Sequence, residues 1–167
     1  SKEEKSKGVV AFSSGNHAQG IAYASRELGT SAKIVMPSDA PKIKIWKTQE
    51  YGAEVIFYER DEDNREEIGF SMAKEEGRKL IKPFDDLNVI YGQGTAALEV
   101  MDEVDTKFDM SVVCCSGGGL AAGTGIVLKN SLSDCQLYTA EPKDWNDHEK
   151  SFFQNNIVSI ETKKHGI

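Results

Sequence analysis

Residues 8–20 read GVVAFSSGNHAQG, and residues 111–125 read SVVCCSGGGLAAGTG. Each stretch begins with an apolar run typical of a buried strand, passes through serine and glycine, and continues as a helix-forming segment. The run at residues 111–115 is the most apolar in the chain, and we expect it to be the most buried strand. Two strand–loop–helix junctions of this kind predict an α/β fold.

The same alternation fills the rest of the chain. Strands are predicted at 8–12, 32–36, 54–58, 80–84, 111–115 and 137–140, and helices at 16–28, 41–51, after the acidic run 59–67 to about 79, at 94–104 and from 120 to about 130. Strands alternating with helices predict βαβ units and a mostly parallel sheet. Turn residues at 85–92 predict a boundary between two lobes, residues 1–90 and 91–167.

Composition excludes several classes of protein. The 167 residues contain 20 Lys and Arg against 27 Asp and Glu, a net charge of −7, which opposes binding to nucleic acid or an anionic membrane. No apolar run reaches the roughly 20 residues of a membrane-spanning helix, and no secretory signal is evident. The sequence is therefore typical of a soluble, cytoplasmic protein with no nucleic-acid or membrane partner.

Cysteine and histidine give no metal pattern in the sequence. The three cysteines are too few for a disulfide framework and form no C-x-x-C pair, so we expect them to pack in the sheets. His17, His148 and His165 lack the spacing of metal ligands.

Loops that follow strands are the candidate ligand sites, because ligands of open α/β sheets bind beyond the carboxyl ends of the strands. Ser13, Ser14, Gly15, Asn16 and His17 combine hydroxyl groups with the free N–H groups of a helix start. This arrangement suits a carboxylate or phosphate. An ordinary helix cap is the alternative interpretation.

A second such loop consists of Ser116, Gly117, Gly118, Gly119 and Leu120. Successive glycines let backbone N–H groups surround a phosphate, and the dipole of the following helix adds attraction. The alternative is a glycine turn with no ligand. The position of the loop between an apolar strand and a helix of small residues favours phosphate.

A nicotinamide cofactor is the obvious competing ligand. Residues 92–97, GQGTAA, fit the pattern G-x-G-x-x-A. However, only the short apolar run 89–91 precedes them, and no acidic residue follows at the distance that ribose binding requires. The lysine of a nucleoside-triphosphate P-loop is also absent, so both nucleotide interpretations are weak.

Four motifs together carry a family resemblance: SSGNHAQG at 13–20, GQGTAALE at 92–99, SGGGL at 116–120 and Glu-Pro at 141–142. With them, the chain resembles the fold-type II pyridoxal-phosphate (PLP) enzymes of the serine racemase, threonine dehydratase and hydroxyaspartate dehydratase group. The resemblance implies a three-layer αβα fold with mostly parallel sheets, similar to tryptophan synthase β and incomplete at both ends. It also implies a homo-oligomer, dimer or tetramer, when the protein is full length.

The resemblance assigns roles to the two loops. Residues 116–120 would hold the cofactor phosphate through backbone N–H groups, although Ser116 stands where the family usually has glycine. Asn16 would bind the 3′ oxygen of the cofactor. The substrate-binding residues would be Ser13, Ser14, Gly15, Asn16, His17 and Arg65.

Ser14 would be the catalytic acid and base opposite the cofactor-binding lysine in racemase-like members; a helix-cap serine is the other interpretation. Arg65 matches an arginine near the substrate mouth in such members, and an exposed loop arginine is an equal alternative.

Glu141 and Asp147, with the carbonyl of Trp145, are oxygen ligands of the kind that Mg²⁺ or Ca²⁺ prefers. The residues alone leave solvated turn acids as an alternative, whereas the resemblance implies a metal at these positions.

The expected reaction is PLP-dependent dehydration of serine, threonine or 3-hydroxyaspartate to a keto acid and ammonia, racemisation of serine, or both. Members of the family carry the cofactor-binding lysine in a Ser-Phe-Lys-x-Arg-Gly-type motif upstream of the SSGNH loop, and no such motif occurs here. We therefore expect residues 1–167 alone to be inactive and to belong to a longer enzyme. The alternative is a non-catalytic phosphate- or carboxylate-binding fragment or a lysine-less relative.

Overall fold

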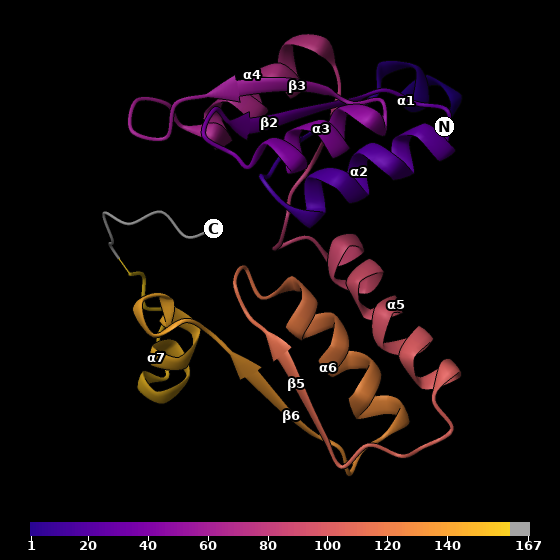
Figure 1. Cartoon of the computed structure of the whole chain (residues 1–167), viewed down its shortest axis with the longest axis vertical. Helices are drawn as coiled ribbons and strands as arrows, with labels where there is room; N and C mark the ends of the chain where they lie inside the picture. Colours follow the sequence, from indigo (N-terminus) through magenta and orange to yellow (C-terminus); the bar gives the residue numbers. More distant parts are fainter. Residues whose placement is uncertain (161–167) are drawn as a thin grey trace. The chain divides into compact units, whose positions relative to one another are not determined.

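The computed structural model describes residues 1–160, and His165 therefore lies outside the described residues. The chain divides into two compact units, Ser1–Pro83 and Phe84–Ile167 (Figure 1). The division falls earlier than the expected one after residue 90. Within residues 1–160, no helix has both the length and the apolar content needed to cross a bilayer.

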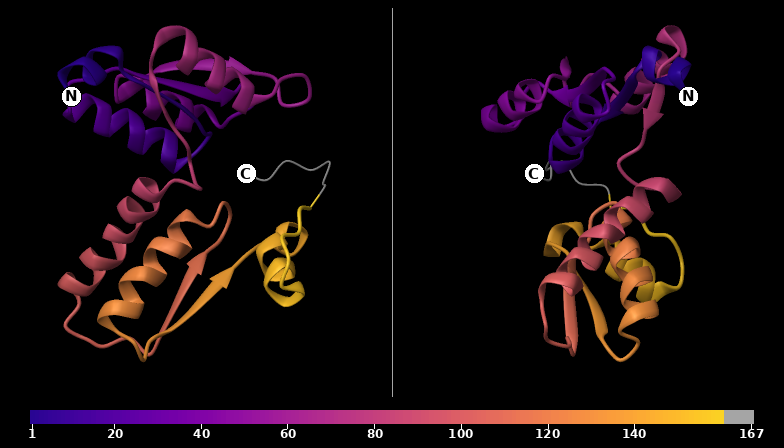
Figure 2. Two further views of the ribbon diagram at one scale, coloured as in Figure 1. Left: turned by 180° about the vertical axis from the view of Figure 1, so that it is seen from behind. Right: turned by 90° about the vertical axis from the view of Figure 1, so that its right-hand side faces the viewer.

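The first unit is a four-stranded parallel sheet with helices on both faces (Figures 1 and 2). The strand order is β3-β2-β1-β4. Its elements are α1 (Lys2–Lys7), β1 (Val9–Phe12), α2 (Asn16–Glu27), β2 (Ala32–Pro37), α3 (Lys42–Glu50), β3 (Glu54–Tyr58), α4 (Arg65–Glu76) and β4 (Lys79–Ile81). The predicted three-layer αβα arrangement is confirmed in this unit.

Alternation along β1 creates two cores, because successive side chains of a strand point to opposite faces. Ala11 faces α2 and α3 and packs among small residues that let these helices approach the sheet closely. Val10 and Phe12 face α4 on the other side. All three residues are almost fully buried, so β1 is enclosed on both faces of the sheet.

Three local features differ from the sequence expectations. Helix α4 ends at Glu76, not near residue 79, because Gly77 adopts a left-handed conformation with φ of 65°. Lys79 then pairs with Val9 in the sheet, so β4 begins earlier and ends earlier than predicted. The charged N-terminus forms the short helix α1, which a capping box between Ser1 and Glu4 stabilises.

The second unit pairs two parallel strands and packs helices beside them. Its elements are α5 (Leu87–Glu103), β5 (Met110–Cys114), α6 (Gly119–Ser131), β6 (Gln136–Ala140), the 3₁₀ turn η1 (Lys143–Trp145) and α7 (Asp147–Gln154). The predicted strands and the glycine-initiated helix are confirmed, with boundaries shifted by one or two residues.

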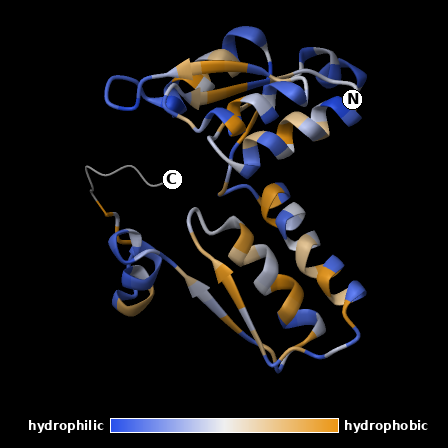
Figure 3. Cartoon of the chain, in the orientation of Figure 1, coloured by the Kyte–Doolittle hydropathy of each residue, from blue (hydrophilic) through white to orange (hydrophobic). Residues whose placement is uncertain are grey.

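Strand β5 is not the most buried strand, and that prediction is wrong for this chain. Val112 and Met110 are each about 60% exposed, and Cys114 is also exposed, in contrast to its predicted packing in the sheet. Figure 3 shows the apolar character of β5 and α6. The reason is that, within residues 1–160, β5 has only β6 as a neighbouring strand, so hydropathy alone overestimates its burial.

The G-x-G-x-x-A run lies inside α5, and residues 89–91 belong to the same helix instead of forming a strand. This placement removes the strand–turn–helix context that a dinucleotide site requires. Its glycine has a packing function: Gly94 lies against Gly123 of α6, and a Cβ on Gly123 would come within 2.6 Å of the Gly94 backbone nitrogen. The two helices therefore cross at backbone contact.

We predict that Gly123→Ala destabilises the second unit by about 1–3 kcal/mol, because the added methyl meets helix backbone that cannot rotate away. Gly92→Ala, in α5 with nothing within 4 Å of its Cβ position, is the matched control and should be neutral or stabilising. Urea unfolding followed by circular dichroism measures both. Equal stability of the two variants would contradict the close crossing.

Candidate functional site

The first candidate loop joins the carboxyl end of β1 to α2. Gly15 is the N-cap of α2, and no side chain caps this helix. The hydroxyl of Ser13 instead accepts a hydrogen bond from the Gly15 N–H at 3.2 Å. The first-turn N–H groups of α2 are consequently available to an anion, as the sequence predicted.

The side chains of this loop are differently placed. Asn16 is exposed, whereas Ser13 and Ser14 are half-buried. The hydroxyl of Ser14 makes no hydrogen bond within residues 1–160. Ser14 is therefore not the cap of α2, so its side chain is available to a ligand.

His17 lies on the first turn of α2 and reaches towards β4. Its Nε2 is 3.4 Å from the carbonyl oxygen of Ile81. Burial lowers the pKa of the ring below its ordinary value of 6.5, and the Ile81 carbonyl only partly opposes this effect. At neutral pH the imidazole is therefore uncharged, and the anion-binding capacity of the loop comes from backbone N–H groups.

Arg65 is brought to the same edge of the sheet. It is the first residue of α4, which Asn64 caps by accepting hydrogen bonds from the Glu66 and Glu67 N–H groups. Its guanidinium lies 5.7 Å from the centre of the Phe12 ring, at the end of β1 where the first loop begins. A cation is thus held beside the predicted substrate loop.

The second candidate loop joins β5 to α6 and consists of Ser116, Gly117, Gly118, Gly119 and Leu120. Gly118 has φ of 81° and is the N-cap of α6 without any side-chain cap. A side chain at Gly117 would collide with Phe84. Glycine is required at both positions, and the resulting bend leaves the N–H groups at the start of α6 available to a phosphate.

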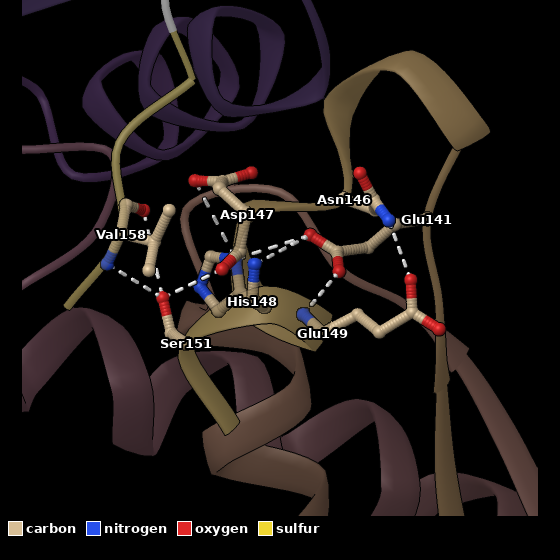
Figure 4. A network of polar contacts seen from close by, with 7 residues as sticks. All are labelled: Glu141, Asn146, Asp147, His148, Glu149, Ser151 and Val158. Atoms are coloured by element: carbon tan, nitrogen blue, oxygen red, sulfur yellow. Dashed lines mark hydrogen bonds and ion pairs between the residues drawn. The ribbon is translucent and has the colours of Figure 1, made fainter. Parts of the chain in front are cut away.

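Glu141 follows β6 and organises the start of α7. Figure 4 shows its carboxylate directed at the first turn, where Oε1 accepts a hydrogen bond from the His148 N–H at 3.2 Å and Oε2 accepts one from the Glu149 N–H at 2.9 Å. The carboxylate is only 4% exposed. Its position is therefore fixed by the fold.

Asp147 converges on the same point. The Nδ1 atom of His148 lies 3.2 Å from Glu141 Oε1 and 3.9 Å from Asp147 Oδ2, so the two predicted carboxylates flank one ring nitrogen. Between them in the chain, Asn146 has a buried Oδ1 with no hydrogen-bond partner among the described residues. A buried oxygen without a partner and two carboxylates are groups of the kind that a hard divalent cation binds. The backbone N–H of Trp145 donates to Pro142, which closes the η1 turn.

Sequence reasoning missed Cys115 and His148. The Sγ of Cys115, a carboxylate oxygen of Glu141 and a ring nitrogen of His148 all lie within 4.8 Å of one another, although the sequence spacing of His148 shows no metal-binding pattern. Strand pairing could have indicated this: Cys114 is the partner of Ala140, which makes Cys115 and Glu141 neighbours. Burial raises the pKa of the Cys115 thiol, and the carboxylates of Glu141 and Asp147 add to the rise.

The sequence matches one known protein family along its whole length. The model of the family described as pyridoxal-phosphate dependent enzyme matches residues 1–167. The chain belongs to this family. It is 43% identical over 161 residues to a serine racemase of Schizosaccharomyces pombe, covering 96% of this chain and 50% of that protein.

Two further relatives agree. An L-threo-3-hydroxyaspartate ammonia-lyase of a Pseudomonas species is 47% identical over 159 residues, which cover 95% of this chain and 50% of that protein. The solved structure of maize serine racemase superposes with a TM-score of 0.89 at 35% identity, over 96% of this chain and 48% of that one. The chain thus spans about half the length of the curated relatives it matches, and the fold-type II PLP architecture is confirmed.

The glycine loop fits the phosphate of PLP. Its bend brings three successive glycines to an uncapped helix start, which is a common way for proteins to bind phosphate through the backbone. The first loop belongs to the other unit. Joint binding of one cofactor and its substrate by both loops stays a prediction.

We predict that the His17 ring titrates below pH 6.5, because its pKa is lowered by burial. The unfolded chain then binds the proton more readily, so the free energy of unfolding should fall as the pH drops below about 6.5 and level off below the folded pKa. Ring-proton NMR titration, with His17→Gln to assign the signal, measures the pKa. A value above 6.5 would contradict the burial argument.

Proposed function

We propose that the protein containing this chain is a PLP-dependent enzyme that acts on a hydroxy-amino acid. The reaction is dehydration of serine, threonine or 3-hydroxyaspartate to a keto acid and ammonia, racemisation of serine, or both. The observation that carries the proposal is the pair of uncapped helix starts, at Gly15 and Gly118, each following a parallel strand. Family membership and relatives that are racemases and ammonia-lyases support it.

Backbone N–H groups of residues 116–120 would hold the cofactor phosphate, with the dipole of α6 adding attraction. When bound, PLP withdraws electrons from the α-carbon of an amino acid, which favours loss of the α-proton and then of the β-hydroxyl. By family resemblance, the amide of Asn16 would bind the 3′ oxygen of the cofactor.

The first loop would orient the substrate. The free N–H groups at the start of α2 would bind its α-carboxylate, with Ser13, Gly15, Asn16 and His17 forming the contact surface. Because the His17 ring is neutral, it would donate or accept a hydrogen bond without contributing charge. Arg65, held over Phe12, would attract the anionic substrate towards this edge.

Ser14 would move a proton at the α-carbon. Its half-buried hydroxyl has no partner within residues 1–160, so it can exchange a proton with a bound substrate. Such a group on one face of the α-carbon, with a lysine on the other, would allow proton removal from one side and return from the other. That is the requirement for racemisation.

We predict that Ser14→Ala, in the protein that contains this chain, lowers serine racemisation by about 10²-fold or more, because it removes a proton-transfer group. Keto-acid formation from L-serine should fall much less. Chiral chromatography and a coupled keto-acid assay separate the two activities. Ser38→Ala, at an exposed serine after β2, is the control and should leave both rates unchanged. Equal losses of both activities would contradict the assigned role.

The alternative function is non-catalytic binding of a phosphate or carboxylate ligand. The uncapped helix starts at Gly15 and Gly118 would serve such a function equally. Assays on the containing protein with L-serine, L-threonine and L-threo-3-hydroxyaspartate decide between the two. Keto acid or D-serine formation supports the enzyme, whereas PLP binding without turnover of any of the three supports the binding module. Residues 1–167 expressed alone should be inactive.

We further propose that Glu141 and Asp147, with the Trp145 carbonyl, bind Mg²⁺ or Ca²⁺. The convergence of both carboxylates on His148 and the unpaired oxygen of Asn146 support this site.

We predict that Asp147→Asn weakens Ca²⁺ binding at least tenfold, because it removes one of two anionic ligands. Isothermal titration calorimetry measures the affinity. Asp134→Asn, in the turn before β6, is the charge-matched control and should bind as the unmodified protein does. Unchanged affinity of the Asp147 variant would exclude this ligand.

We also propose that the protein containing this chain is cytoplasmic and forms a homo-oligomer. The three cysteines are all free thiols, which suits a reducing compartment. Light scattering on the containing protein tests for the dimer or tetramer that the family resemblance implies.

A further inference from the structure

We propose that Cys115, Glu141 and His148 form a site for a thiophilic divalent cation, with Zn²⁺ as the chemical type. This site has a sulfur and a nitrogen ligand and does not use Asp147 or Trp145, so it differs from the oxygen site proposed above. It shares only Glu141 with that site. The inference does not depend on the proposed catalytic activity.

The donor atoms have the separation that a tetrahedral ion requires. Bond lengths of about 2.3 Å to sulfur and about 2.0–2.1 Å to nitrogen or oxygen place ligand atoms about 3.3–3.7 Å apart. The Nδ1 of His148 and the Oε1 of Glu141 are 3.2 Å apart, and all three donors lie within 4.8 Å of one another. Small side-chain rotations of Cys115 or His148 close the remaining gap.

The backbone fixes two of the three ligands. Cys115 and Glu141 come directly after the paired ends of β5 and β6, and the Cys115 N–H donates to the Ala140 carbonyl at 2.9 Å. The carboxylate of Glu141 is in turn held by the N–H groups of His148 and Glu149. A site built on adjacent strand ends and a helix start is preorganised, so little ordering opposes ion binding.

Access and charge also suit an ion. Cys115 and Glu141 are buried, whereas the His148 side chain is 39% exposed and lines a pocket together with Gly118, Ala121 and Phe152. The pocket gives the ion a path from solvent and leaves a fourth position for water. When Sγ binds the cation, the S–H bond breaks and its proton passes to solvent, so the bound thiolate and carboxylate balance the two positive charges.

The site has a consequence for the neighbouring glycine loop. The Nε2 of His148 lies 3.2 Å from the position that a Cβ on Gly118 would occupy. An ion that holds the His148 ring in place would therefore also restrict the backbone at Gly118 in the predicted phosphate loop. Because Glu141 serves both metal sites, a thiophilic ion and Mg²⁺ or Ca²⁺ should exclude each other.

Co²⁺ is the probe that tests the proposal, since a cobalt–thiolate bond gives a charge-transfer absorption in the near ultraviolet that oxygen ligands do not give. Titration of the full chain with Co²⁺ should produce this band with one ion per chain, and Zn²⁺ should remove it. Cys115→Ser should abolish the band, and His148→Gln should weaken Co²⁺ binding at least tenfold. Cys114→Ser, at the adjacent exposed thiol, is the matched control and should keep the band.

A band that survives Cys115→Ser, or that disappears in Cys114→Ser, would overturn the proposal. X-ray absorption of the Zn²⁺-loaded unmodified chain provides a test that needs no variant: one sulfur ligand is expected, and none or two would also overturn it. Asp147→Asn separates this inference from the oxygen site, because that variant should lose Ca²⁺ affinity and keep the cobalt–thiolate band.

Discussion

Unsatisfied backbone N–H groups at two helix starts are the feature on which the functional interpretation depends. Helices α2 and α6 both have glycine at the N-cap, Gly15 and Gly118, and both lack a side-chain cap. Serine, threonine, aspartate or asparagine at the N-cap commonly satisfies these donors, as Asn64 does for α4. Where glycine replaces the cap directly after a parallel strand, the donors and the helix dipole are left for an external anion.

The pairing of β5 with β6 controls the chemistry of the second unit in a comparable way. Parallel register brings the residues after both strands to the same edge, so that Cys115 and Glu141 become neighbours although 26 positions separate them in the chain. Helix α7 then begins against the Glu141 carboxylate and presents His148 to it. The proposed oxygen site and the proposed thiolate–imidazole site thus share the Glu141 carboxylate.

Small residues let the elements approach closely enough for these junctions to form. Gly94 and Gly123 allow α5 and α6 to cross at backbone contact, and Ala11, Ala18 and Ala22 bring α2 onto the first sheet. Any larger side chain at such a contact would displace a helix whose first turn carries the anion-binding groups. Gly94 of the G-x-G-x-x-A run is therefore explained by packing and not by a dinucleotide.

The sequence alone predicted the alternation of strands and helices, the two glycine-containing loops and the family resemblance. These features depend on local periodicity and on motifs of adjacent residues. The burial of β5 could not be predicted in this way. The apolar run 111–115 indicates that its side chains can be buried, but the elements packed against the strand determine how far they are buried. The group of Cys115, Glu141 and His148 gave no signal for the same reason, because Cys115 is distant from the other two residues in the chain. Local chemistry determined the fold class and the loops, and only strand pairing decided which side chains share a site.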